Sequence, residues 1–171
     1  MIFNTKYFLD LFPKISKGLY VTFSITFSSF VIGLIIAIII ALIYKYQVKV
    51  LYQIALVYVS FFRGTPVIAQ MFFIYFGLPH FITPLKRMNA YTAATLTIAL
   101  NVSAYMAETI RASILSVDKG QIEAGLSVGM TNYQVLKRIV FPQAARIVIP
   151  PLANNFIMTL KGTAGAFTIG V

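Results

Sequence analysis

The sequence predicts an all-α fold, a polytopic bundle of membrane-spanning helices in a single domain over residues 1–171. Of these residues, 59% are hydrophobic and only 11% are charged, and the mean hydropathy of +0.85 exceeds what a water-exposed globular surface tolerates. Apolar runs long enough to cross about 30 Å of hydrocarbon recur along the chain. We expect at least four membrane helices, with a cytoplasmic helical hairpin between the third and the fourth.

The first apolar run predicts the clearest membrane helix. Every residue between Lys17 and Lys45 is uncharged, and residues 19–43 suit one span. A cleaved signal peptide would be shorter and would begin with its basic flank at the extreme N-terminus. We therefore interpret this run as a permanent span.

The second and third apolar runs predict two more spans. Residues 64–85 are uncharged but contain several prolines, and their helix can borrow its first turns from residues 51–62. Residues 88–107 form the third run, which begins at an expected membrane interface and continues to about Val117. These two spans complete the first three membrane helices.

The last apolar run predicts an irregular fourth span. Residues 147–171 are interrupted by Pro150 and Pro151 and then by polar residues, a pattern typical of a broken helix beside a polar cavity. The interrupting polar residues are Asn154, Asn155 and Lys161. Because the final residues carry no polar flank, we expect the chain to be truncated at its C-terminus.

The orientation in the membrane follows from Lys and Arg in the short loops, which favour the cytoplasm. The basic residues that predict the cytoplasmic side are Lys45, Lys49, Lys119, Lys137, Arg138 and Arg146. Those on the opposite side, which weaken the bias, are Lys6, Lys14, Lys17, Lys86 and Arg87. The balance predicts an N-terminus outside the cytoplasm.

Composition excludes several classes of function. The chain has a net charge of +10, no Cys, one His and four acidic residues. Its basic residues lie singly or in pairs between apolar runs, which suits membrane topology and not nucleic-acid binding. So few Cys, His and acidic side chains leave little material for a metal site, and the chain lacks the glycine-rich phosphate loop of nucleotide hydrolases. We expect no catalytic residue, no metal and no nucleic-acid partner.

Residues 118–143 differ from the rest because they mix charges with spaced apolar residues. Gly129 suits the left-handed end of a first helix. Thr131 and Gln134 have capping-box spacing for a second helix, which Pro142 is expected to end. Lipid or a partner protein could bury the apolar face of this hairpin, and composition does not separate the two. The face comprises Ile122, Leu126, Met130, Val135, Leu136, Ile139 and Val140.

The same segment carries a motif with specific spacing. It resembles the EAA loop of ATP-binding-cassette (ABC) import permeases, whose pattern is E-A-A-x3-G-x9-I-x-L-P. The matching residues are Glu123, Ala124, Gly125, Gly129, Ile139, Phe141 and Pro142. Gly125 stands where the pattern has its second Ala, and Phe141 stands where it has Leu.

Further segments resemble the polar amino acid branch of these permeases, the histidine and glutamine type. The segments are Arg63-Gly64-Thr65-Pro66 with Gln70, residues 73–79, and residues 104–108 leading to Lys119-Gly120-Gln121. The resemblance covers about residues 18–171. Members of the branch run on through a further span, which agrees with the expected truncation.

The resemblance implies a pore-forming subunit that imports a polar amino acid across the bacterial cytoplasmic (inner) membrane. It implies as partners a dimer of ATP-binding subunits, a second permease copy or homologue, an extracytoplasmic solute-binding protein and membrane lipid. ATP and magnesium then belong to the partner ATPase, and the EAA residues couple the two subunits. This chain would bind no cofactor itself.

Polar residues inside the expected spans are candidates to line a substrate pathway, because such groups bond the ammonium and carboxylate of an amino acid. They are Arg63, Gly64, Thr65, Pro66, Gln70, Asn101, Tyr105, Glu108, Asn154 and Asn155. The amides and hydroxyls have a simpler alternative as bonds between helices. Arg63 can instead anchor a span at the membrane surface. Glu108 lies about 27 Å along its helix from Ala90, near the cytoplasmic interface, where it can pair with Arg111.

Other functions remain as alternatives. A secondary, ion-coupled transporter is one, although the sequence has no clear inverted repeat and no acid expected at mid-membrane. A membrane scaffold without transport is another. A membrane enzyme would need a constellation of His or carboxylate groups at one membrane face, which the four acids and the single His are not placed to supply.

Overall fold

A computed structural model of the chain describes residues 5–171, with side chains from residue 15 onward and at positions 11 and 13. Within this range the chain is helical and contains no strand. The α-helices are α1 Thr5–Tyr46, α2 Lys49–Gly64, α3 Val67–Phe72, α4 Leu78–Phe81, α5 Ala90–Leu115, α6 Lys119–Ser127, α7 Asn132–Val135 and α8 Phe141–Gly162. The connecting turns are π-helical at Phe73–Gly77 and Leu136–Val140 and 3-10 at Thr83–Arg87 and Thr163–Ile169. The side chains of Lys6 and Lys14 lie outside the described residues.

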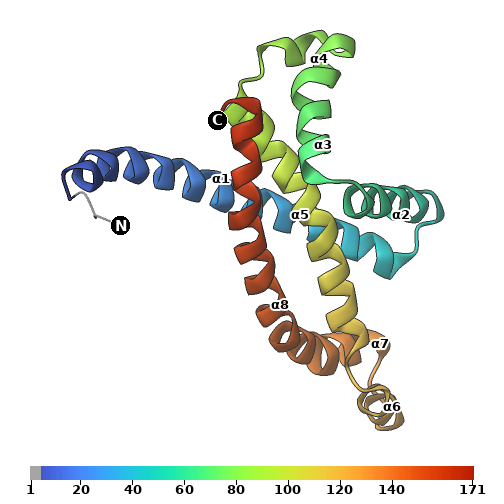
Figure 1. Ribbon diagram of the computed structural model, residues 1–171. Coiled ribbons are helices and arrows are strands. Elements are labelled where there is room, and N and C mark those ends of the chain that lie inside the picture. The colour runs from blue at the N-terminus through green and yellow to red at the C-terminus, as the bar shows by residue number, and fades with distance from the viewer. Residues whose placement is uncertain (1–4) are drawn as a thin grey trace.

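The helices form an elongated bundle. Figure 1 shows α5 and α8 running side by side, α1 crossing them, α3 and α4 at one end, and α6 and α7 at the other. Residues Ile15–Tyr46 of α1 are long and apolar enough to cross a membrane, and the bent pair Lys49–Gly64 and Val67–Phe81 can supply a second crossing. The more polar α5 and α8 have 26 and 22 residues, which at about 1.5 Å per residue exceeds the hydrocarbon thickness.

The interface between α1 and α5 is built from small residues at every fourth position on both helices. They are Ser29, Gly33 and Ala37 on α1 and Ala99, Ser103 and Ala107 on α5. Such stripes let helix backbones approach closely in a membrane, where water does not drive association. The Ser29 hydroxyl donates a hydrogen bond to the Thr95 carbonyl at 2.9 Å, which fixes the register of the two helices.

The second span is not one straight helix running back through α2, as residues 51–62 could have made it, because the chain bends sharply between α2 and α3. The chain bends by 110° between α2 and the segment Val67–Phe81. Thr65, between them, is extended, with φ −117° and ψ 145°. A residue that precedes proline is disfavoured in the α conformation, so Pro66 forces the bend. Arg63 therefore lies at a corner of the chain and not inside a straight helix.

Proline positions also correct the prediction for the last span. Pro150 and Pro151 lie inside α8 without breaking it, and Pro142 lies in its first turn, so the chain stays helical from residue 132 to residue 162. A π-helical turn directly precedes α4, which contains Pro79, and α8, which contains Pro142. The wider π turn changes the hydrogen-bond register ahead of each proline, which relieves the clash that a proline makes with the carbonyl four residues earlier.

Candidate functional site

The turn of the hairpin has the local structure that its residues predict. Gly129 has φ +84°, as the left-handed end of α6 requires. The N–H of Met130 donates to the Gly125 carbonyl at 3.1 Å, and that of Gly129 donates to the Leu126 carbonyl at 3.0 Å, which is a Schellman motif. Beyond the turn, a capping box joins Thr131 and Gln134 through hydrogen bonds of 3.3 and 2.8 Å. The glycine end and the capping box are confirmed.

Most of the apolar face of the hairpin packs inside the chain, which corrects both interpretations of what buries it. Val117, Val135, Val140 and Ala144 form a small buried core. The residues packed around this core are Ile114, Ile122, Met130, Leu136 and Ile139. Neither lipid nor a partner protein is needed to cover these side chains, because the hairpin is held against the ends of α5 and α8.

Gly125 lets the two hairpin helices approach closely. A Cβ at this position would lie 2.7 Å from Ile139 Cδ1 and 3.0 Å from Val135 Cγ2. The glycine in place of the second Ala of the motif therefore fits this packing. Ile139, another motif residue, is the side chain that lies nearest to Gly125.

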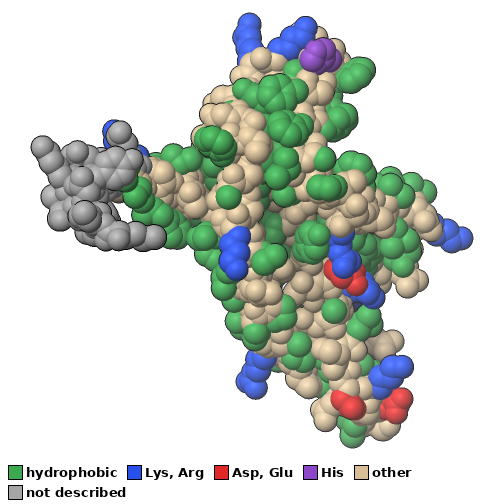
Figure 2. Space-filling model, in the orientation of Figure 1, with side chains coloured by type: hydrophobic (Ala, Val, Ile, Leu, Met, Phe, Trp, Pro, Cys, Tyr) green, Lys and Arg blue, Asp and Glu red, His purple; other side chains and the backbone are tan. Residues whose placement is uncertain are grey.

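A different face of the hairpin remains open. Leu126, Val128 and Tyr133 are 43, 78 and 68% exposed, and Glu123 is also exposed beside them. No Lys or Arg within the described residues forms an ion pair with Glu123. Figure 2 shows acidic side chains at the α6 end of the molecule, with hydrophobic and basic side chains close by. This open face combines exposed apolar groups with one unpaired carboxylate.

The bend between α2 and α3 is held by a buried amide. Gln70 is 4% exposed, and its Nε2 donates to the carbonyls of Phe62 and Thr65, both at 3.1 Å, and to Thr65 Oγ1 at 2.6 Å. Its Oε1 accepts from Asn101 Nδ2 at 3.1 Å, and the same Nδ2 donates to the Phe62 carbonyl at 2.9 Å. The carbonyls that the bend frees are thus satisfied by side chains, which favours the interhelical role for Gln70 and Thr65.

A cavity of about 560 Å³ lies between α5 and α8. Its polar lining consists of Asn101, Tyr105, Asn154, Asn155, Thr159 and Lys161. Four of the ten predicted pathway residues therefore meet at one place. Asn155 Nδ2 also donates to Thr109 Oγ1 at 3.2 Å, which joins α8 to α5. Lys161 is not among the residues predicted for the pathway, although a lone charge in an apolar run is a signal that could have identified it.

The remaining pathway candidates lie outside this cavity. The Arg63 guanidinium carbon lies 5.6 Å from the centre of the Tyr105 ring, and the Tyr105 hydroxyl donates to the Arg63 carbonyl at 3.4 Å, so Arg63 borders the cavity. Arg111 pairs with Glu108, with Nε donating to Oε2 at 3.0 Å and Nη2 donating to Oε1. The predicted ion pair is confirmed, and it faces a separate hollow. Gly64 and Pro66 shape the bend.

Comparison with known proteins identifies this arrangement. Residues 10–171 match the family model described as the binding-protein-dependent transport system inner membrane component. The chain belongs to this family. It is a transport permease of the inner membrane, which favours the permease interpretation over the secondary transporter and the scaffold.

Individual relatives of the chain are also described as permeases. The probable amino-acid ABC transporter permease protein PatM of Vibrio harveyi is 43% identical over all of this chain and 77% of its own length. The glutamine transport system permease protein GlnP of Escherichia coli is 42% identical over 69% of this chain and 53% of its own length. A crystal structure of an amino acid ABC transporter with histidines matches all of this permease and 78% of the solved chain, with a TM-score of 0.92 and 36% identity.

Replacing Gln70 by Leu is expected to destabilise the permease by about 1 to 3 kcal/mol, because the Phe62 and Thr65 carbonyls and the Asn101 amide lose a buried partner. Gln53, exposed on α2, provides a matched control in Gln53→Leu. Unfolding of both variants in the same lipid-detergent mixture measures the difference. Equal stability of the two variants would contradict a bracing role for Gln70.

Proposed function

We propose that the permease carries a polar amino acid inward across the bacterial inner membrane as part of an ATP-driven importer. The names of its relatives support amino acids as the substrate class. The cavity between α5 and α8 is the observation that carries the proposal, because its size and the amide, hydroxyl and ammonium groups in its lining suit a small zwitterion.

The proposed binding mode follows from the chemistry of the cavity. Lys161 supplies a positive charge for the carboxylate of the substrate, and charge-assisted hydrogen bonds are stronger than neutral ones. The amide oxygens of Asn101, Asn154 and Asn155 are acceptors for its ammonium group. Tyr105, held by Arg63, closes one side of this space. No Asp or Glu of the described chain lines the cavity.

We propose further that the open face of the hairpin docks on a dimer of ATP-binding subunits, which hold ATP and magnesium. Exposed Leu126, Val128 and Tyr133 offer apolar contact, and Glu123 offers a carboxylate for a partner Arg. The other coupling residues shape this surface, with Ala124 exposed on α6 and Phe141 69% exposed at the start of α8 beside Pro142.

The rest of the proposed assembly follows from the family's binding-protein dependence. An extracytoplasmic solute-binding protein delivers substrate, and a second permease copy or homologue completes the pathway. The N-terminus lies outside the cytoplasm, so that the end carrying α6 and α7 faces the ATPases.

Lys161→Gln is expected to raise the substrate concentration for half-maximal uptake at least tenfold, the scale of one hydrogen bond to a charged group. Uptake by the assembled transporter in proteoliposomes measures this change. An amine analogue of the substrate that lacks the carboxylate should inhibit uptake equally in wild type and in Lys161→Gln, because it has no group that would bind Lys161. Lys86→Gln, in the 3-10 turn Thr83–Arg87 and outside the cavity, is the matched control. Unchanged apparent affinity in Lys161→Gln would contradict the proposed binding mode.

A further inference from the structure

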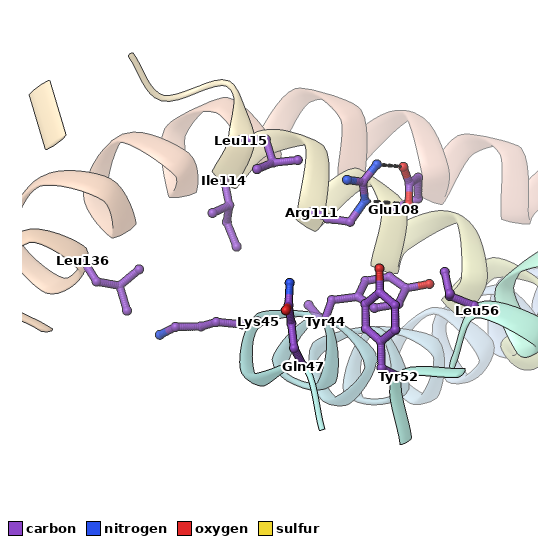
Figure 3. Close-up of a pocket in the computed structure, with 11 residues that line it drawn as sticks. Tyr44, Lys45, Gln47, Tyr52, Leu56, Glu108, Arg111, Ile114, Leu115 and Leu136 are labelled. Carbon is purple, nitrogen blue, oxygen red and sulfur yellow. Dashed lines mark hydrogen bonds and ion pairs between the residues drawn. The ribbon is translucent and has the colours of Figure 1, made fainter. Parts of the chain in front are cut away.

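A second hollow, of about 370 Å³, lies apart from the transport cavity. It is bordered by the C-terminal end of α1, the start of α2, the last turns of α5 and the π-helical turn that follows α7. Figure 3 shows Gln47 and Tyr52 on one wall facing the Glu108–Arg111 pair on the other, with Lys45 extending beside them toward Leu136. The hollow shares no lining residue with the transport cavity.

The depth of the hollow places it at one membrane surface. Glu108 and Arg111 lie about 27 and 32 Å along α5 from Ala90, at about 1.5 Å per residue, so they reach the far side of a hydrocarbon layer about 30 Å thick. Lys45 is in the last turn of the long span α1. Tyr44 and Tyr52, with ring centres 5.6 Å apart, are of the residue type that collects at the membrane-water interface. The hairpin lies at the same end of α5, so in the proposed orientation this is the cytoplasmic surface.

The charges of the hollow favour an anion. Arg111 uses Nε and Nη2 on Glu108, and within residues 5–171 its Nη1 makes no hydrogen bond. Lys45 forms no ion pair in the same part of the chain and rests 5.3 Å from the centre of the Tyr46 ring. Two cations and one carboxylate leave an excess of positive charge. The Gln47 amide and the Tyr52 hydroxyl add neutral donors around it.

The rest of the lining favours a ligand with a hydrocarbon part. Leu56, Ile114, Leu115 and Leu136 line the hollow together with the polar groups. Leu115 is 67% exposed, so this apolar wall continues onto the outer surface of the helices. A free phosphate or nucleotide would leave the wall unused, whereas an acyl chain would cover it.

We propose that this hollow binds an anionic phospholipid of the inner leaflet. Lys45 and the free face of the Arg111 guanidinium contact the headgroup phosphate, Gln47 and Tyr52 bond its oxygens, and the acyl chains follow the leucine wall out to the bilayer. Basic pockets between membrane helices on the cytoplasmic side recognise lipid headgroups in this way. The bound lipid would join α1 and α2 to the hairpin end of α5.

The proposal is tested on the assembled full-length transporter by native mass spectrometry after addition of phosphatidylglycerol or phosphatidylcholine. Lys45→Gln should lower retention of phosphatidylglycerol about fivefold, the scale of one basic residue against an anionic lipid. Lys49→Gln, at the first residue of α2 and outside the hollow, is the control and should retain the lipid. Tyr52→Phe is a second variant, expected to lower retention about twofold by removing one neutral donor.

Retention of phosphatidylglycerol over phosphatidylcholine, lost in Lys45→Gln and kept in Lys49→Gln, supports the site. Equal loss in both lysine variants, or equal retention of the two lipids, overturns it. Competition by soluble glycerol phosphate would assign the hollow to a free anion. A crosslink from Leu115→Cys to another protein subunit would assign it to a protein contact. Either of these results would overturn the proposal that the hollow binds a phospholipid. Amino acid uptake is measured separately, so failure of the lipid site leaves the proposed transport function standing.

Discussion

Replacing Gly33 by Leu is expected to cost about 3 kcal/mol of stability or more, at the upper end of what overpacking a close interface costs. A Cβ at this position would lie 2.7 Å from Val102 Cγ1, 3.1 Å from the Ala99 carbonyl oxygen and 3.5 Å from the Ser103 nitrogen. The backbone atoms of α5 cannot rotate away as a side chain can. The introduced leucine side chain would therefore push α1 off the helix on which most of the bundle is assembled.

The same helix provides the control. A Cβ at Gly18 meets no atom within 4 Å, so Gly18→Leu makes the same chemical change on α1 without a clash. The amount of folded permease in the membrane and its unfolding temperature in detergent are compared for the two variants. If Gly33→Leu matched Gly18→Leu in both measurements, the α1–α5 contact would not be the organising interface.

Replacing Glu123 by Gln is expected to weaken assembly with the ATP-binding subunits by about 2 to 5 kcal/mol, because a desolvated partner cation would be left poorly paired. This corresponds to a loss of affinity of roughly thirtyfold or more. If Glu123 serves only the solubility of α6, the change removes a surface charge worth at most about 1 kcal/mol. The two ranges do not overlap, so the measured affinity for the ATP-binding subunits distinguishes a docking role of Glu123 from a role in solubility.

Lys119→Gln is the control, since it removes a charge from another exposed position of α6. Assembly affinity and substrate-stimulated ATP hydrolysis are measured for both variants in a full-length background. Loss of both properties in Glu123→Gln alone is the expected result. Unchanged affinity together with unchanged stimulation would remove Glu123 from the coupling surface.

Local patterns were enough to predict much of this fold. Uncharged runs such as residues 18–44 predict helices, because in hydrocarbon a single segment can satisfy all its backbone hydrogen bonds only as a helix. The N-cap of α5 at Asn89, which accepts from the Thr92 N–H at 2.8 Å, lies where the third apolar run begins. Gly129 and the Thr131–Gln134 box fixed the hairpin turn, since their hydrogen bonds join residues within a few positions of each other.

The prolines show where local rules are insufficient. Pro142, Pro150 and Pro151 were expected to end or break helices, yet the chain is helical through all three. The cost of a missing N–H depends on what else the freed carbonyl meets and on whether a neighbouring turn can widen. At Pro66 the proline does bend the chain, and Gln70 and Asn101 stabilise the Phe62 carbonyl that the bend exposes.

The sequence by itself determined the helical class, the order of the spans, the hairpin turn and the family motif, because each depends on residues near one another along the chain. Only the tertiary structure decided which polar residues share a cavity and which brace a bend. Gln70 and Asn154 look equally suited to a pathway in sequence, yet one is buried in a network joining α2, α3 and α5 and the other lines the cavity. It also decided that Val135 and Val140 pack inside the chain while Val128 stays exposed. The contacts of a side chain depend on helices that are far apart in the sequence and pack together in the fold. The apolar or polar character of one residue does not indicate which helix it will contact.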